Sequence, residues 1–215
     1  MEQKPLLSRM SLRSKITNRI GATLLLWALN PISASAHIPI PPKQPSEIGR
    51  RVVNTAVADF TLVDQYGNPF RFSSKRGNLV LATFVFTACP DVCPLFTAKF
   101  AGIQRTLNER RFNEYWLLSI TTDPEVDNAT TLKEYGRRFK ADFAHWSFLT
   151  GPREDLAKTW KIFGVSVTKT QGGQVFHTAL TTLIDRQGNR RVDYFGDKWL
   201  DKEVLKDIQW LSASR

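Results

Sequence analysis

The sequence contains very few side chains that bind soft metal ions. Its 215 residues include two cysteines and two methionines, and both methionines, Met1 and Met10, lie near the start of the chain. Cys89 and Cys93 are the only soft ligands in the remainder. A chain of this length builds a core without a disulfide, so the two thiols are free for chemistry. A structural zinc site, which takes four ligands, is disfavoured because too few donors are present.

The sequence also lacks a long apolar run at its N-terminus. The segment Ile20–Leu29 is apolar over about ten residues, half of the roughly 20 that a membrane-spanning helix needs. A basic segment precedes it, and the small residues Ser33–Ala36 follow. This pattern predicts a secretory signal peptide over residues 1–36 and an exported, periplasmic protein. An uncleaved N-terminal membrane anchor and a mitochondrial transit peptide are the alternatives.

No basic run is interleaved with aromatic residues, which makes nucleic acid a poor candidate partner. Removal of residues 1–36 takes away five basic residues and one acidic residue, and lowers the net charge from +10 to +6. That charge suits a protein working near anionic lipids or an acidic partner. Residues 37–55 are proline-rich and lack periodicity, so we interpret them as a linker. Residues 56–215 are expected to form one domain.

Within this domain, apolar strand patterns alternate with helical patterns. The run 78–86 is almost continuously apolar, as expected for a strand buried on both faces. Apolar residues recur at helical spacing from Pro94 to Leu107. The complete order is a hairpin (58–64 and 69–72), a β-α-β-α-β-α unit with strands 78–86, 116–122 and 146–150, a second hairpin (178–184 and 191–195) and a helix (200–211). This order predicts an α/β fold with a mostly parallel sheet, flanked by helices and extended by hairpins.

The two cysteines follow directly on the strand 78–86. Ligands of such sheets bind at the carboxyl ends of the strands. A thiol at a helix N-terminus ionises more easily, so we expect a cysteine pair of low pKa. The pair can bind a soft metal, cycle as a disulfide, or do both. A purely structural disulfide is disfavoured, because such a short loop gains little entropy on cross-linking.

Three histidines follow the predicted signal peptide, and one of them, His177, is the candidate third ligand. His177 lies in the segment that enters the strand 178–184, and this segment is expected to pass close to the loop that carries Cys89 and Cys93. Two thiolates and one imidazole form an S₂N site that suits Cu(I) and can also hold Cu(II). His145 precedes a strand and is interpreted as structural. His37 becomes the first residue if the signal is cut after Ala36, and then chelates Cu(II) in a less favoured hypothesis.

The segment Cys89-Pro90-Asp91-Val92-Cys93-Pro94 resembles the signature of the Sco/SenC family, thioredoxin-like copper proteins that assist cytochrome c oxidase assembly. The similarity continues in four further segments: Ser119–Glu125, His177-Thr178, Asp185–Gly188 and Asp193–Gly196. It covers the chain from about Ala56 onwards. The resemblance implies a thioredoxin-like fold, with Cys89, Cys93 and His177 as the copper ligands. Asp91 and Asp123 are implied to be acidic residues near the site.

The resemblance implies a copper metallochaperone that delivers copper to the binuclear copper site of cytochrome c oxidase. The expected partners are the copper-site subunit of the oxidase, other periplasmic copper chaperones and thioredoxin-like reductants. One alternative is a thiol–disulfide oxidoreductase that uses Cys89 and Cys93 as its redox pair to reduce the cysteines of that site. The other alternative is a copper or redox sensor. His177 separates the first two functions, because a reductase needs only the cysteines.

Overall fold

The computed structural model describes residues 49–213, and its central strand is β4 (Leu79–Val85), in which all seven residues are buried. Leu79 and Leu81 pack into one hydrophobic core, and Val80, Ala82 and Phe84 pack into the other. Successive side chains of a strand point to opposite faces. An uninterrupted apolar run at this position therefore contributes side chains to both cores.

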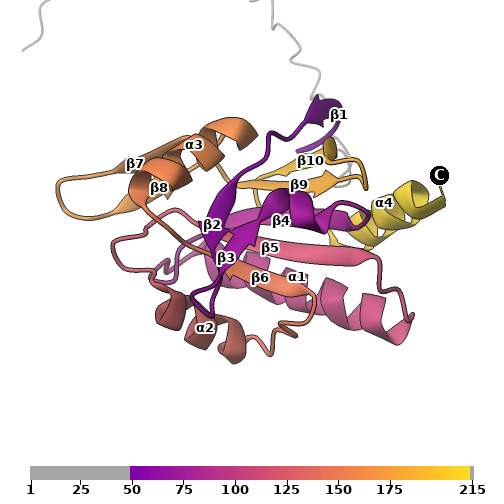
Figure 1. The fold of residues 1–215 in the computed structure, drawn as a ribbon, viewed down its shortest axis with the longest axis horizontal. Helices are drawn as coiled ribbons and strands as arrows, with labels where there is room; N and C mark the ends of the chain where they lie inside the picture. Colours follow the sequence, from indigo (N-terminus) through magenta and orange to yellow (C-terminus); the bar gives the residue numbers. More distant parts are fainter. Residues whose placement is uncertain (1–48, 214–215) are drawn as a thin grey trace, which may run out of the picture. The chain divides into compact units, whose positions relative to one another are not determined.

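The strands and helices of the described residues follow the predicted alternation for most of the chain (Figure 1). The strands are β1 (Arg50–Ala56), β2 (Thr61–Val63), β3 (Pro69–Arg71), β4, β5 (Tyr115–Thr121), β6 (Trp146–Leu149), β7 (Val167–Lys169), β8 (Val175–His177), β9 (Leu180–Ile184) and β10 (Asn189–Phe195). The helices are a 3₁₀ turn η2 (Phe72–Lys75), α1 (Val92–Glu109), α2 (Ala129–Arg138), α3 (Arg153–Phe163) and α4 (Asp201–Ala213).

Six strands form the main sheet, in the order β1-β10-β9-β4-β5-β6. β4, β5 and β6 are parallel. β9 pairs antiparallel with β4, and Thr83 lies opposite Thr181. β10 and β1 extend this antiparallel side. The segment before β9 and the segment after β4 consequently lie at the same edge of the sheet.

Helices cover both faces of this sheet. One core joins α1, α2 and α4 to the sheet, with Phe100, Leu132 and Ile208 among its buried residues. The other core lies under α3 and the β2–β3 hairpin, and it includes Phe163 and Phe70. The predicted α/β architecture is thus confirmed, with helices on both faces of a mixed sheet in which β4, β5 and β6 form the parallel side.

Two strand pairings were missing from the sequence-based prediction. β1 occupies residues that we assigned in large part to the linker 37–55, so the final third of that linker prediction is wrong. β1 is mostly exposed and lies at the edge of the sheet, so its sequence carries no burial pattern. β7 and β8 form a separate two-stranded sheet of three residues per strand. Strands of only three residues give no periodic signal.

The predicted signal peptide (1–36), His37 and most of the predicted linker lie outside the described residues. Those predictions stay untested. Between residues 49 and 213, no helix has the length and apolar character needed to cross a membrane.

Candidate metal centre

The two cysteines lie where β4 gives way to α1, as predicted. Residues 86–91 form the connecting loop, in which the amide of Cys89 donates a hydrogen bond to the carbonyl of Phe86 at 3.2 Å. Cys93 is the second residue of α1 and is fully buried, with 0% of its surface exposed. Cys89 is half-buried, and neither cysteine is in a disulfide. The pair therefore presents one accessible thiol and one enclosed thiol. We name residues 86–93 the cysteine loop.

His177 reaches the cysteine loop through the antiparallel pairing of β9 with β4. It is the last residue of β8, three residues before β9 begins. Its Nε2 lies 3.9 Å from the Sγ of Cys93, and its ring makes an edge contact with Phe86 at a centroid distance of 6.0 Å. The predicted approach of His177 to the cysteines is thus observed.

The hydrogen bonds of His177 assign its tautomer. Nδ1 lies 3.0 Å from the carbonyl oxygen of Thr178, which can only accept, so Nδ1 carries the proton. Nε2 then presents a lone pair toward Cys93. Burial lowers the pKa of His177, and the bond to Thr178 opposes this shift. The geometry thus favours a neutral imidazole with Nε2 free to bind a metal ion.

The expectation of a low-pKa cysteine pair is wrong for Cys93. Burial, together with a hydrogen bond with Cys89, raises the pKa of the Cys93 thiol far above its ordinary value. That expectation took account of the positive end of α1 but not of the loss of water around a fully enclosed sulfur. Desolvation disfavours the charged form and outweighs the helix end here.

Cys89 and His177 line one open cleft of about 720 Å³. Both acidic residues expected near the site, Asp91 and Asp123, also line it. Phe176 stands at its rim with 54% of its surface exposed. Within residues 49–213, no three side chains among histidine, cysteine, aspartate and glutamate lie close enough together to hold a metal ion. The cleft therefore brings Cys89 and His177 near one another, without a fully assembled set of three ligands.

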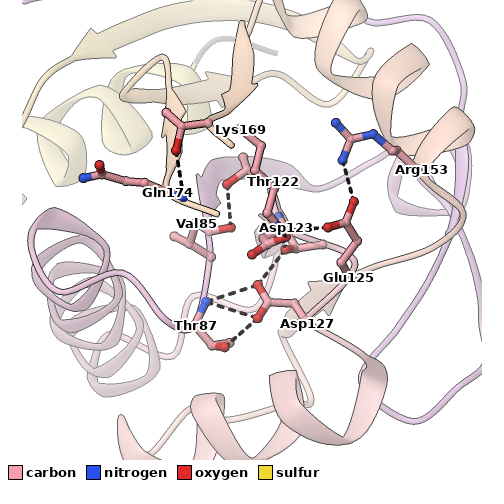
Figure 2. Close-up of polar contacts among 11 residues, drawn as sticks. Val85, Thr87, Thr122, Asp123, Glu125, Asp127, Arg153, Lys169 and Gln174 are labelled. Atoms are coloured by element: carbon pink, nitrogen blue, oxygen red, sulfur yellow. Dashed lines mark hydrogen bonds and ion pairs between the residues drawn. The ribbon is translucent and has the colours of Figure 1, made fainter. Parts of the chain in front are cut away.

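An ion pair ties the β7–β8 hairpin, which carries His177, to the loop after β5. Lys169 of β7 donates to Asp123 at 2.8 Å and to Glu125 at 2.7 Å. Glu125 is also paired with Arg153 at 3.2 Å, and both side chains are visible in Figure 2. Hydrogen bonds with Asp123 and Glu125 raise the pKa of Lys169. No sequence pattern indicated this contact, because it joins segments more than 40 residues apart.

A second polar network holds the start of the cysteine loop. The fully buried carboxylate of Asp127 accepts bonds from the amide of Thr87, at 3.1 Å, and from its hydroxyl, at 2.5 Å (Figure 2). It also accepts a hydrogen bond from the hydroxyl of Thr121, at 2.6 Å. Burial raises the pKa of Asp127, and the bonds from both threonines act in the opposite direction. Asp127 was missing from the predicted site, and its only signal in the sequence was a second aspartate after β5.

His145 plays the structural part predicted for it. Its ring stacks on Tyr115 at a centroid distance of 4.9 Å, and its Nδ1 lies 3.2 Å from the carbonyl oxygen of the same residue. It precedes β6 at the amino end of that strand, whereas the cysteine loop follows the carboxyl end of β4. His145 is thus separate from the candidate centre.

Comparisons with known proteins agree with this combination of fold and site. The SCO1/SenC family model matches residues 49–213. The SCO1 protein homolog of Bacillus subtilis is 31% identical over 165 residues, which cover 75% of this chain and 85% of that protein. The solved structure of Bradyrhizobium japonicum ScoI with copper bound has a TM-score of 0.64 and 29% identity, and the match covers 73% of this chain and 99% of ScoI.

A third relative is BsSco, described as having a disulfide switch and as a member of the Sco family of cytochrome c oxidase assembly proteins. Its structure has a TM-score of 0.67 and 28% identity, and the match covers 77% of this chain and 98% of that one. The fold and the cysteine pair beside a histidine define a thioredoxin-like protein of the Sco type. The chain belongs to the SCO1/SenC family.

Proposed function

We propose that this protein is a copper chaperone that binds one copper ion through Cys89, Cys93 and His177 and delivers it to the binuclear copper site of cytochrome c oxidase. The observation that carries the proposal is the approach of His177 Nε2 to Cys93 Sγ at 3.9 Å. Metal–thiolate and metal–imidazole bonds of about 2.3 and 2.0 Å, arranged trigonally, place sulfur and nitrogen about 3.7 Å apart. The two donors thus stand near the separation that a shared metal ion requires.

The donor set suits copper better than the common alternatives. Thiolates select soft ions such as Cu(I), and the imidazole extends the range to Cu(II). A related structure is described as ScoI with copper bound, which supports the same metal here. Cys89 lines the open cleft and can meet a partner, whereas Cys93 lies buried beside His177. Copper would be exchanged with a partner one thiolate at a time.

As part of this proposal, the recipient is the copper-site subunit of the oxidase, and the domain works close to a membrane. The periplasm is the proposed location, with mitochondria as the alternative. The proposal rests on the predicted signal peptide and on relatives described as oxidase assembly proteins. Oxidase copper content in cells that lack the gene checks delivery, and normal content would favour a copper or redox sensor instead.

The ligand set is tested by metal analysis and electronic spectra of the reduced protein. Wild type is expected to bind one copper ion per chain, with thiolate-to-copper charge-transfer bands that disappear in Cys89→Ser. In His177→Ala, the affinity for Cu(II) falls most, because two thiolates still suit Cu(I). His145→Ala is the matched control, since it removes a histidine remote from the cleft. An unchanged affinity in His177→Ala would refute the three-ligand site.

A second function, thiol–disulfide exchange, is favoured by the unequal exposure of the two free cysteines. An accessible thiol can attack a partner disulfide, and an enclosed thiol can then resolve the mixed disulfide. The disulfide switch described for the related BsSco supports the same chemistry here. Reduction of a peptide disulfide by wild type and His177→Ala at equal rates, with no copper bound by either, would favour this function.

A further inference from the structure

Asp127 is a buried carboxylate, and its hydrogen-bond donors among residues 49–213 are all neutral. The amide and hydroxyl of Thr87 and the hydroxyl of Thr121 supply them. The hydroxyl of Thr121 donates a hydrogen bond to Asp127 and accepts one from the amide of Asp123. Every contact is therefore a donation to the carboxylate, which is the pattern expected of an anion.

Asp127 joins two loops that leave neighbouring strands. Thr121 is the last residue of β5, and Thr87 lies two residues beyond the end of β4 and two before Cys89. β4 and β5 are paired up to Val85 and Thr121, and Thr122 donates from its amide to Val85 at 2.8 Å. Beyond this point, the pairing of β4 with β5 no longer holds the cysteine loop. The carboxylate of Asp127 holds the chain there, two residues before the first thiol.

Capping of α2 does not account for this aspartate. The N-cap residue is Asn128, whose side chain accepts the amide of Thr131 at 2.9 Å. A turn that needed only a hydrogen-bond acceptor would be served by a neutral side chain. A charge taken out of water is costly unless it is well bonded. A fully buried anion beside a cation site therefore calls for an explanation beyond folding.

We propose that Asp127 is a positioning residue for the copper site. It acts through Thr87 to fix the cysteine loop, and its charge favours a bound cation close by. The inference rests on the proposed function, because it concerns the same three ligands. Partners of metal ligands typically change metal affinity 10- to 100-fold when they are altered. Because Asp127 acts through one intervening residue, we expect a change of about tenfold, at the low end of that range.

The test compares copper affinity and the Cu(II)/Cu(I) potential in variants of the complete chain. Asp127→Asn keeps the size of the side chain and removes its charge. We expect copper affinity to fall about tenfold. We also expect the affinity for Cu(II) to fall about tenfold more than the affinity for Cu(I), which corresponds to a rise of about 59 mV in the Cu(II)/Cu(I) potential.

Two variants of Thr87 separate positioning from folding. Thr87→Val removes the hydroxyl donor and keeps the amide, and should weaken copper binding. Thr87→Ser restores the hydroxyl and should return affinity to the wild-type value. The matched control is Thr159→Val, because its hydroxyl is also hydrogen-bonded, at 2.8 Å to the carbonyl of Asp155 within α3. That variant should lower the melting temperature without changing copper affinity or potential.

The outcomes distinguish the inference from the proposed function. If wild type binds no copper, the proposed function fails. Suppose instead that wild type binds copper and that both Asp127→Asn and Thr87→Val have the same copper affinity and potential as wild type. Asp127 then serves the fold alone, and the inference is overturned. If Asp127→Asn does not fold, the Thr87→Val and Thr87→Ser pair decides, since a common affinity for both would contradict positioning.

Discussion

A hydrogen-bond chain behind Cys93 gives a sharp test of how the buried thiol is held in place. The hydroxyl of Thr97 donates to the carbonyl of Cys93 at 2.9 Å, and it lies 2.9 Å from the hydroxyl of Tyr135. Because Thr97 has a single hydroxyl proton, already used on Cys93, the donor in the second bond must be Tyr135. Tyr135 belongs to α2 and is 4% exposed, so the chain joins α2 to the first turns of α1.

The direction of these bonds makes the two single variants unequal. Tyr135→Phe removes a donor, and Thr97 keeps its bond to Cys93, so the free energy of unfolding should fall by only about 0.5–1.5 kcal/mol. Thr97→Val leaves the hydroxyl of Tyr135 buried without its acceptor, which costs about 1–3 kcal/mol. In the double variant no buried hydroxyl is left unpaired, so its cost should be about 1 kcal/mol below the sum of the single costs.

Urea unfolding measures these differences, provided that the dependence on denaturant stays the same for all four proteins. Copper stoichiometry should not change, because the two hydroxyls bond to each other and to the carbonyl of Cys93, not to a candidate ligand atom. Additive costs within about 0.5 kcal/mol would show that the two hydroxyls are not coupled. A larger loss in Tyr135→Phe than in Thr97→Val would show that the assigned donor is wrong.

Two further predictions concern polar contacts at the surface. Lys169→Met breaks the ion pair that ties the hairpin carrying His177 to the loop after β5. Amide hydrogen exchange in β7 and β8 should therefore become several-fold faster. The control is Lys158→Met, which breaks an exposed ion pair within α3 and should leave the exchange in β7 and β8 unchanged. Burial alone would raise the pKa of Asp59, but bonds from an arginine and a serine outweigh it and lower the pKa to about 2. Asp59 therefore contributes stability above its unfolded pKa of 3.8, and this contribution is lost as the pH falls from 3.8 toward 2. The free energy of unfolding of Asp59→Asn should depend less on pH between 3.8 and 2 than that of wild type. The same dependence on pH in both proteins would contradict the lowered pKa of Asp59.

The sequence was informative wherever burial dictated structure. β4 was predicted because its continuous apolar run serves two cores, and α1 because Phe96, Phe100 and Leu107 recur at helical spacing and are buried. β1 was missed because backbone pairing and the bidentate ion pair of Arg50 with Asp207 hold it, and neither leaves an apolar pattern. Strand and helix signals report hydrophobic faces, so an exposed edge strand escapes them.

The same distinction between buried apolar contacts and polar contacts applies to the candidate site. Cys93 lies at the start of α1, which packs into one core, and shortly after β4, which packs into both, so its place at the junction followed from the apolar pattern. His177 lies on a two-stranded sheet of its own, joined to the loop after β5 by the ion pair of Lys169. Val175 and Val167 of that hairpin also pack against the domain, but its contact with the loop after β5 joins distant polar side chains, which no local pattern encodes. The pKa of Cys93 shows the same limit, because the helix end is visible in the sequence and the enclosure of the sulfur is not. The apolar pattern thus places the thiols and, through the pairing of β9 with β4, brings His177 near them, whereas the ion pair of Lys169 that joins its hairpin to the loop after β5 left no signal in the sequence.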